Sequence, residues 1–126
     1  MAEYTLTFGE APTSDDKLFG TLAHLSTLVS SFVGPLLIVL LIGDKAPYIK
    51  YHAMQALGLQ AALWVGGTVA GSVIAVISFL TCGFGSLLGL LAIPLIPVLM
   101  LAPLWGAWLA WEGRWAGYPM MESIGR

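Results

Sequence analysis

Charge is what this sequence has least of. Among 126 residues, 5 are Lys or Arg and 7 are Asp or Glu, so 10% are charged while 58% are apolar. A soluble domain carries charge on about a quarter of its residues, and a chain of this length cannot bury so much apolar surface in its own core. The composition therefore predicts an all-α membrane protein that is surrounded largely by the lipid bilayer.

Other scarcities exclude several classes of function. The net charge of −2 offers no basic surface for nucleic acid. A single cysteine, Cys82, excludes an intrachain disulfide and a cysteine metal cluster. The apolar segments contain no acidic residue, which argues against hydrolysis or proton-coupled transport within the membrane. We therefore expect a non-enzymatic protein with no catalytic residue, no metal site and no cofactor.

Two long stretches without charge predict three transmembrane helices. Residues 18–43 contain no Asp, Glu, Lys or Arg, and neither do residues 51–111. About 20 apolar residues cross a bilayer, so the first stretch fits one span and the second fits two spans joined by a turn at 81–86. The expected helices run over about 17–43, 47–80 and 87–111.

Prolines predict departures from straight helices. Pro94, Pro97 and Pro103 should kink the third helix, because each removes a backbone donor. Gly34 and Pro35 should bend the first helix. Outside the spans, we expect a flexible acidic N-terminal tail and a short C-terminal tail. The predicted divisions are 1–16 for the tail, 17–119 for the three-span membrane domain and 120–126 for the C-terminal tail.

Orientation follows from the basic residues. With three spans, Lys45, Lys50, Arg114 and Arg126 would lie on one side of the membrane and Lys17 on the other. Basic residues concentrate on the cytoplasmic side. We therefore expect the loop 44–52 and the C-terminus to be cytoplasmic, in a bacterial inner membrane or an organelle membrane derived from it.

Two patterns predict helix packing. His24, Thr27 and Ser31 recur at spacings of three and four, which gives the first span a polar stripe that should face other helices, because lipid offers no hydrogen-bond partners. On the second span, small residues recur every four positions in two adjacent rows, a pattern that allows helix backbones to approach closely. The predicted packing residues are Gly58, Ala62, Gly66, Gly67, Ala70 and Gly71.

The start of the second span is the most varied stretch chemically. It carries a patch with two interpretations: a site for a partner or a lipid headgroup, or a polar helix start whose glutamines bond across to the first span. His24 and His52 also have two interpretations. In the first they have a chemical role, as ligands of a haem iron or as a proton relay; in the second they form ordinary hydrogen bonds. The patch consists of Lys45, Tyr48, Lys50, Tyr51, His52, Gln55 and Gln60.

Four segments resemble a known family. They are LAHLS at 22–26, GPLLIVLL at 34–41, YIKYHAMQALGLQ at 48–60 and EGRWAGYP at 112–119. This pattern resembles the bacterial family of small three-span membrane proteins that includes the magnetosome proteins of the MamF/MmsF type. It is similar, more distantly, to the chloroplast inner-envelope translocon subunit with four spans. The resemblance implies a membrane location and, in the magnetosome branch, a role in organelle and crystal maturation.

These observations predict a scaffold or accessory subunit of a membrane assembly. Its expected partners are the lipid bilayer and other membrane proteins or further copies of itself, which would give a homo-oligomer. Two alternatives stay open at this point. One is a pore-forming or translocon-like component, and the other is a haem- or pigment-binding subunit that uses His24 and His52.

Overall fold

The computed structural model describes residues 11–115, 117–119, 121 and 123–125, and this part of the chain contains helices and turns without strands. The predicted all-α class is therefore confirmed. The helices are α2 (Ser14–Leu25), α3 (Thr27–Ser30), α4 (Val33–Ile42), α5 (Pro47–Leu80), the 3₁₀ turn η1 (Phe84–Ser86), α6 (Leu87–Ala92) and α7 (Leu95–Trp111).

A reciprocal cap fixes the start of α2. The hydroxyl of Thr13 accepts a hydrogen bond from the backbone N–H of Asp16 (3.2 Å), and the Asp16 carboxylate accepts one from the N–H of Thr13 (2.9 Å). This arrangement satisfies two donors that a helix end leaves unpaired. α2 thus begins at Ser14, and residues 1–10 of the predicted tail lie outside the described part.

The first predicted span does not form one helix. The chain turns at residues 31–32, between α3, which ends at Ser30, and α4, which begins at Val33. Ser31 has a φ angle of 54° and a ψ angle of −117°, a conformation that a continuing α-helix cannot use. The hydroxyl of Ser30 accepts from the backbone N–H of Gly34 (2.9 Å). Such side-chain bonds offer the backbone an alternative to the helix ladder and here help to end it.

The predicted bend at Gly34–Pro35 is therefore found a few residues earlier, as a reversal of the chain. Pro35 is the third residue of α4. In the first turn of a helix a backbone N–H has no partner within the helix, so proline costs nothing there. The proline is thus compatible with a new helix start and incompatible with the interior of a continuous span.

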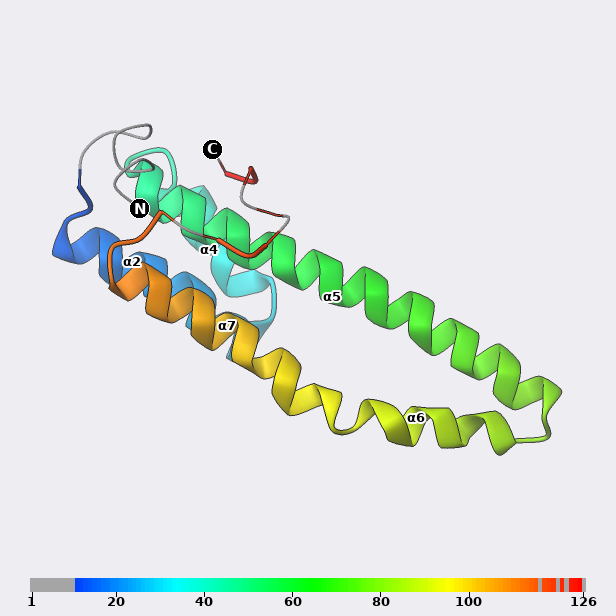
Figure 1. The fold of residues 1–126 in the computed structure, drawn as a ribbon. Helices are drawn as coiled ribbons and strands as arrows, with labels where there is room; N and C mark the ends of the chain where they lie inside the picture. Colours follow the sequence, from blue (N-terminus) through cyan, green and yellow to red (C-terminus); the bar gives the residue numbers. More distant parts are fainter. Residues whose placement is uncertain (1–10, 116, 120, 122, 126) are drawn as a thin grey trace.

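Contacts along α5 fix the arrangement of the helices (Figure 1). Gly20 of α2 lies against Tyr48, near the start of α5, and His24 lies against His52 one turn later. At the reversal, Ser31 bonds to Gln60 of α5. α2 consequently runs beside α5 in the same direction, α4 returns toward the start of α5, and α7 packs antiparallel on α2.

Two described helical segments, rather than the predicted three, are long and apolar enough to cross a membrane. They are Pro47–Leu80 and Phe84–Trp111. α5 has 34 residues, which gives a length of about 51 Å. α2 and α4 accompany only its first part, as far as Gln60. Beyond that point α5 and the α6–α7 arm form a hairpin with almost no buried side chain (Figure 1).

The third predicted helix is interrupted, as its prolines indicated. α6 ends at Ala92, Ile93 and Pro94 form a turn, and α7 begins at Leu95. Pro103 lies inside α7 without ending it. The kink thus lies at the first of the three prolines.

Most of the described charged side chains gather at one end of the molecule. Lys17 lies beside Gly113, just past the end of α7, and Thr13 shares a pocket with Lys45. The expectation that Lys17 lies on the opposite side from Lys45 is therefore wrong. The comparison of basic residues on two sides, from which the orientation was predicted, rested on a third span that the structure does not show.

Candidate functional site

A buried chain of hydrogen bonds joins three elements at the charged end. Nδ1 of His24 lies 3.0 Å from the Tyr118 hydroxyl, and Nε2 of His24 lies 3.1 Å from Nδ1 of His52. Nε2 of His52 lies 2.8 Å from the carbonyl oxygen of Arg114. The exposed fractions of His24 and His52 are 1% and 0%. The chain thus connects α2, α5 and the segment after α7 within the protein interior.

Only one arrangement of protons satisfies this chain when both rings are neutral. The Arg114 carbonyl can only accept, so Nε2 of His52 is the donor and Nδ1 of His52 the acceptor. His24 must then donate from Nε2, and its Nδ1 accepts from the Tyr118 hydroxyl. Burial raises the pKa of Tyr118 above its ordinary value, so this hydroxyl keeps the proton that it donates. Each ring thereby fixes the tautomer of the next.

Gln55 holds the C-terminal segment against α5. Its Nε2 donates to the carbonyl oxygens of Met121 and Ile124, the latter at 2.8 Å. Its Oε1 accepts from the backbone N–H of Tyr118 at 3.1 Å. Tyr48 adds a bond of 2.7 Å from its hydroxyl to the Ala110 carbonyl. These bonds end on backbone groups. They therefore fix the position of the C-terminal backbone against α5 and do not depend on the side chains of that segment.

Two glycines permit this close packing. A Cβ at Gly106 would lie 2.5 Å from both Nδ1 of His24 and the hydroxyl oxygen of Tyr118. A Cβ at Gly117 would collide with the amide of Gln55. The hydrogen-bonded cluster therefore depends on the absence of side chains at these two positions.

The seven residues of the predicted patch separate into two groups. Lys45 and Lys50 are exposed, and Lys50 lies 4.0 Å from Asp44. The other five face the interior. Four of them form hydrogen bonds to His24 of α2, to Ser31, to α7 or to the segment after α7, and the ring of Tyr51 packs against His52 and Trp115. These buried members are Tyr48, Tyr51, His52, Gln55 and Gln60.

The predicted polar stripe of the first span also lies inside. Thr27 is buried and donates to the carbonyl oxygen of His24 (2.6 Å). Ser31 donates to Oε1 of Gln60 (2.9 Å) and accepts from Nε1 of Trp64 (3.1 Å). The stripe thus contacts α5 along its first half and fixes the level at which the chain reverses.

All four ring nitrogens of the two histidines are engaged. Bis-histidine ligation of a haem iron needs one free nitrogen from each ring pointing at the metal. His24 and His52 instead point at each other and at fixed partners. Among the described residues, no group of three or more His, Cys, Asp or Glu could hold a metal ion. The geometry suits a structural hydrogen-bond chain better than a cofactor site.

The predicted packing rows lie on the uncovered half of α5. A Cβ at Gly66, Gly67 or Gly71 would meet no atom within 4 Å, and Ala62 and Ala70 are exposed. Gly58 differs, because it packs against Ile124 and Met121 of the C-terminal segment. Within the described part of the chain, these rows therefore have no partner helix beyond Gly58.

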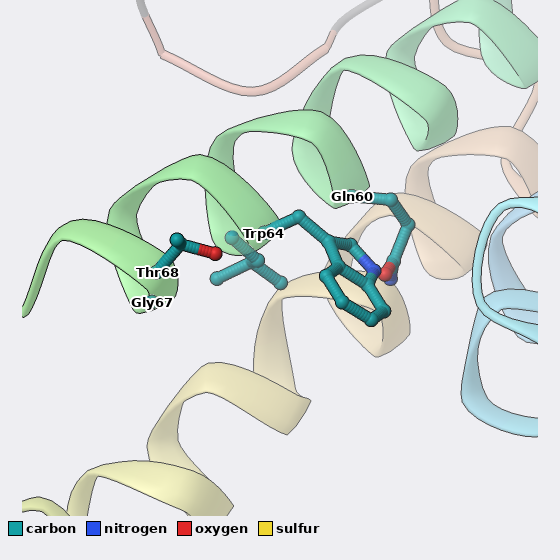
Figure 2. Close-up of a pocket in the computed structure, with 5 residues that line it drawn as sticks. Gln60, Trp64, Gly67 and Thr68 are labelled. Atoms are coloured by element: carbon teal, nitrogen blue, oxygen red, sulfur yellow. The ribbon is translucent and has the colours of Figure 1, made fainter. Parts of the chain in front are cut away.

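An open groove of about 300 Å³ begins at the level of the chain reversal between α3 and α4. It is lined by Gln60, Leu63, Trp64, Gly67 and Thr68. Figure 2 shows that the side chains of Gln60 and Trp64 extend from the same side of α5, with Thr68 and Gly67 one turn further along. The groove therefore joins the polar contact with Ser31 to the bare glycine row.

Comparison with known proteins decides the family. A family model described as the magnetosome magnetite crystal formation protein family (MamF/MmsF) matches residues 15–124. The chain belongs to this family. The matched range covers all the described helices except the first residue of α2, and it includes the C-terminal segment that Gln55 holds. No curated protein and no solved structure matches the chain.

Membership in the magnetosome family confirms the resemblance found in the sequence and, with the two exposed apolar helices, indicates association with a membrane. Sequence reasoning missed the roles of Tyr118, Gly106 and Gly117. The segment EGRWAGYP contributed to the resemblance, but the sequence analysis assigned no role to its Trp115 and Tyr118. In the structure Trp115 and Tyr118 are buried, whereas Trp111 is exposed. A tyrosine beside a glycine was the only local signal for this packing.

Proposed function

We propose that this protein is a non-enzymatic membrane scaffold in magnetite crystal formation, which assembles through the bare face of α5. The observation that carries the proposal is the division of the molecule into two parts. One end satisfies its polar groups internally, and the other presents an unpacked apolar hairpin with rows of small residues. The expected location is a bacterial inner membrane or an organelle membrane derived from it.

The chemistry of the hairpin supports assembly within the membrane. Helices in lipid associate through van der Waals packing, which is best where small residues let backbones approach. Gly67 and Gly71 form a GxxxG pair with open space around both. Gln60 lies on the same face, and in the described part of the chain its amide nitrogen has no acceptor. A partner helix at this face would gain both close packing and an interhelical hydrogen bond.

The engaged state of the polar cluster supports a role without catalysis. His24, His52, Gln55 and Tyr118 bind one another or backbone groups of the same chain. A catalytic base needs a free position toward a substrate. These residues are better placed to hold the charged end in one conformation, from which the hairpin extends.

Replacing glycine by leucine on the bare face tests the proposal. Gly67→Leu fills open space and leaves the polar cluster untouched, so the chain should fold but lose its oligomers or partners in native mass spectrometry from mild detergent. Gly89→Leu on α6 is the matched control, because Gly89 also faces open space. Assembly that is unchanged by Gly67→Leu would refute the role of this face.

A separate measurement distinguishes a scaffold from the pore-forming alternative. Purified protein in liposomes should leave the ion permeability of the bilayer unchanged. A conductance that Gly67→Leu abolishes would instead favour a pore formed by the assembled hairpins.

A further inference from the structure

The helical cross-section of the molecule changes along its length. At the charged end, α2, α4, α5 and α7 lie side by side (Figure 1). The reversal at Ser31 ends the contribution of α2 and α4, at the level of Gln60 and Trp64. From there to the turn at η1, the described part of the chain continues only as α5 and the α6–α7 arm. Four helical segments thus become two.

The wider end is apolar on its outside as well as polar in its interior. Val29 in α3 is 92% exposed, and Leu40 and Leu41 in α4 are each 70% exposed. No described part of the chain covers these side chains. Their surface continues without a charged residue into the exposed hairpin, so the same acyl chains that surround the hairpin would cover them. α3 and α4 therefore belong within the bilayer rather than in water.

The lengths assign these extra helices to a single leaflet. Gln60 is the fourteenth residue of α5, so the reversal lies about 20 Å from the start of this helix. The remaining part of α5, residues 61–80, extends for about 30 Å, which is the full thickness of the hydrocarbon core. If the far tip stops at the far surface, the reversal lies at the near boundary of the core, and if the tip projects further, α4 enters the core from the charged side. In both cases α2 and α4 widen the protein only on the charged side of the bilayer.

We propose that this asymmetry makes the protein a wedge that binds preferentially to curved membrane, with its charged end in the convex leaflet. The two additional helices occupy roughly 80 Å² each, from a helix diameter of about 10 Å. A convex leaflet has more area per lipid tail than the concave leaflet opposite, so it accommodates the wide end with less strain. The preference needs no contact between copies and is therefore independent of the scaffold role.

Vesicles of two sizes test the proposal. The full-length protein, labelled at Cys82, is reconstituted at low protein density into a mixture of small and large vesicles of phosphatidylcholine and phosphatidylglycerol. The protein-to-lipid ratio of single vesicles is then read by fluorescence. The small vesicles should contain severalfold more protein per lipid, and trypsin added outside should cut the basic sites of the charged end. Equal ratios, or charged ends facing the lumen of small vesicles, would overturn the proposal.

Two matched variants should act with opposite signs. Leu40→Ala with Leu41→Ala narrows the wide end, so the preference for small vesicles should fall. Leu90→Ala with Leu91→Ala removes the same volume from α6 at the narrow end, so the preference should rise. Leu90 and Leu91 are 58% and 69% exposed, close to the exposure of the first pair. A change of the same sign in both variants would contradict the wedge, and the low protein density keeps the outcome separate from self-association.

Discussion

Removal of the Tyr118 hydroxyl is the sharpest test of the buried hydrogen-bond chain. Tyr118→Phe keeps the ring, so it leaves no cavity, but it takes the donor away from Nδ1 of His24. That nitrogen is buried and has a single lone pair. A buried acceptor without a partner costs about 1–3 kcal/mol, and we expect the free energy of unfolding to fall by this amount.

A change of tautomer cannot rescue the variant. If His24 moved its proton to Nδ1, its Nε2 would face the unprotonated Nδ1 of His52 at 3.1 Å. His52 would then have to move its own proton, which would place a bare Nε2 against the Arg114 carbonyl at 2.8 Å. Every arrangement of protons on the two neutral rings therefore leaves one buried hydrogen-bonding group without a partner. The loss in the free energy of unfolding of Tyr118→Phe is not relieved by a change of tautomer.

Tyr48→Phe is the matched control. Its hydroxyl donates to the Ala110 carbonyl at 2.7 Å, but this oxygen also accepts from the backbone N–H of Gly113 at 3.1 Å. Loss of the hydroxyl thus leaves no orphan, and we expect a cost of only about 0.5–1 kcal/mol. Unfolding in mixed micelles of mild detergent and dodecyl sulfate, followed by tryptophan fluorescence, measures both variants. The reasoning fails if Tyr118→Phe unfolds like the wild type or costs less than Tyr48→Phe.

Helix content was predictable from the sequence because it depends on local properties. The long charge-free stretches, the proline at the start of α5 and the glycines of the turn at 81–86 placed the ends of α5 at Pro47 and Leu80, as observed. The prolines likewise predicted an interrupted third helix. Lipid rewards apolar helices wherever they are long enough, so composition and length suffice for these features.

The reversal at Ser31 was not predictable in the same way. Residues 18–43 have the composition of a full span, and nothing in their order shows that Ser31 takes a positive φ. Its hydroxyl is held by Gln60 and Trp64, which follow about thirty residues later. The break is thus stabilised by contacts between segments that are distant in the sequence. The pattern of residues within one helix cannot predict such contacts.

The burial of His52 was not predictable for a related reason. Its neighbours Lys50 and Tyr51 are of the types that gather at the headgroup level of a membrane, and they give no sign of a covered imidazole. The C-terminal segment folds back over this part of α5 and covers the imidazole, while Lys50 points outward. A charged residue therefore indicates the depth of that part of the helix in the membrane. It does not show whether another segment covers the other faces of the helix.

Two further predictions separate this packing and topology from their alternatives. Gly106→Ala should lower the free energy of unfolding by about 1–3 kcal/mol, because its Cβ would overlap the His24 ring; Gly89→Ala, in open space on α6, should raise it by up to about 1 kcal/mol. Ser14 lies between Thr13 and Asp16, which share a pocket with Lys45, whereas Cys82 lies in the turn that follows the far end of α5 (Figure 1). An impermeant thiol reagent should therefore label Ser14→Cys and Lys45→Cys, each with Cys82→Ser, from one face of the membrane and native Cys82 from the other. A protein with three spans would instead have residues 14 and 45 on opposite faces of the membrane. Labelling of these two variants from different sides would therefore support the three-span topology and refute the wedge proposal.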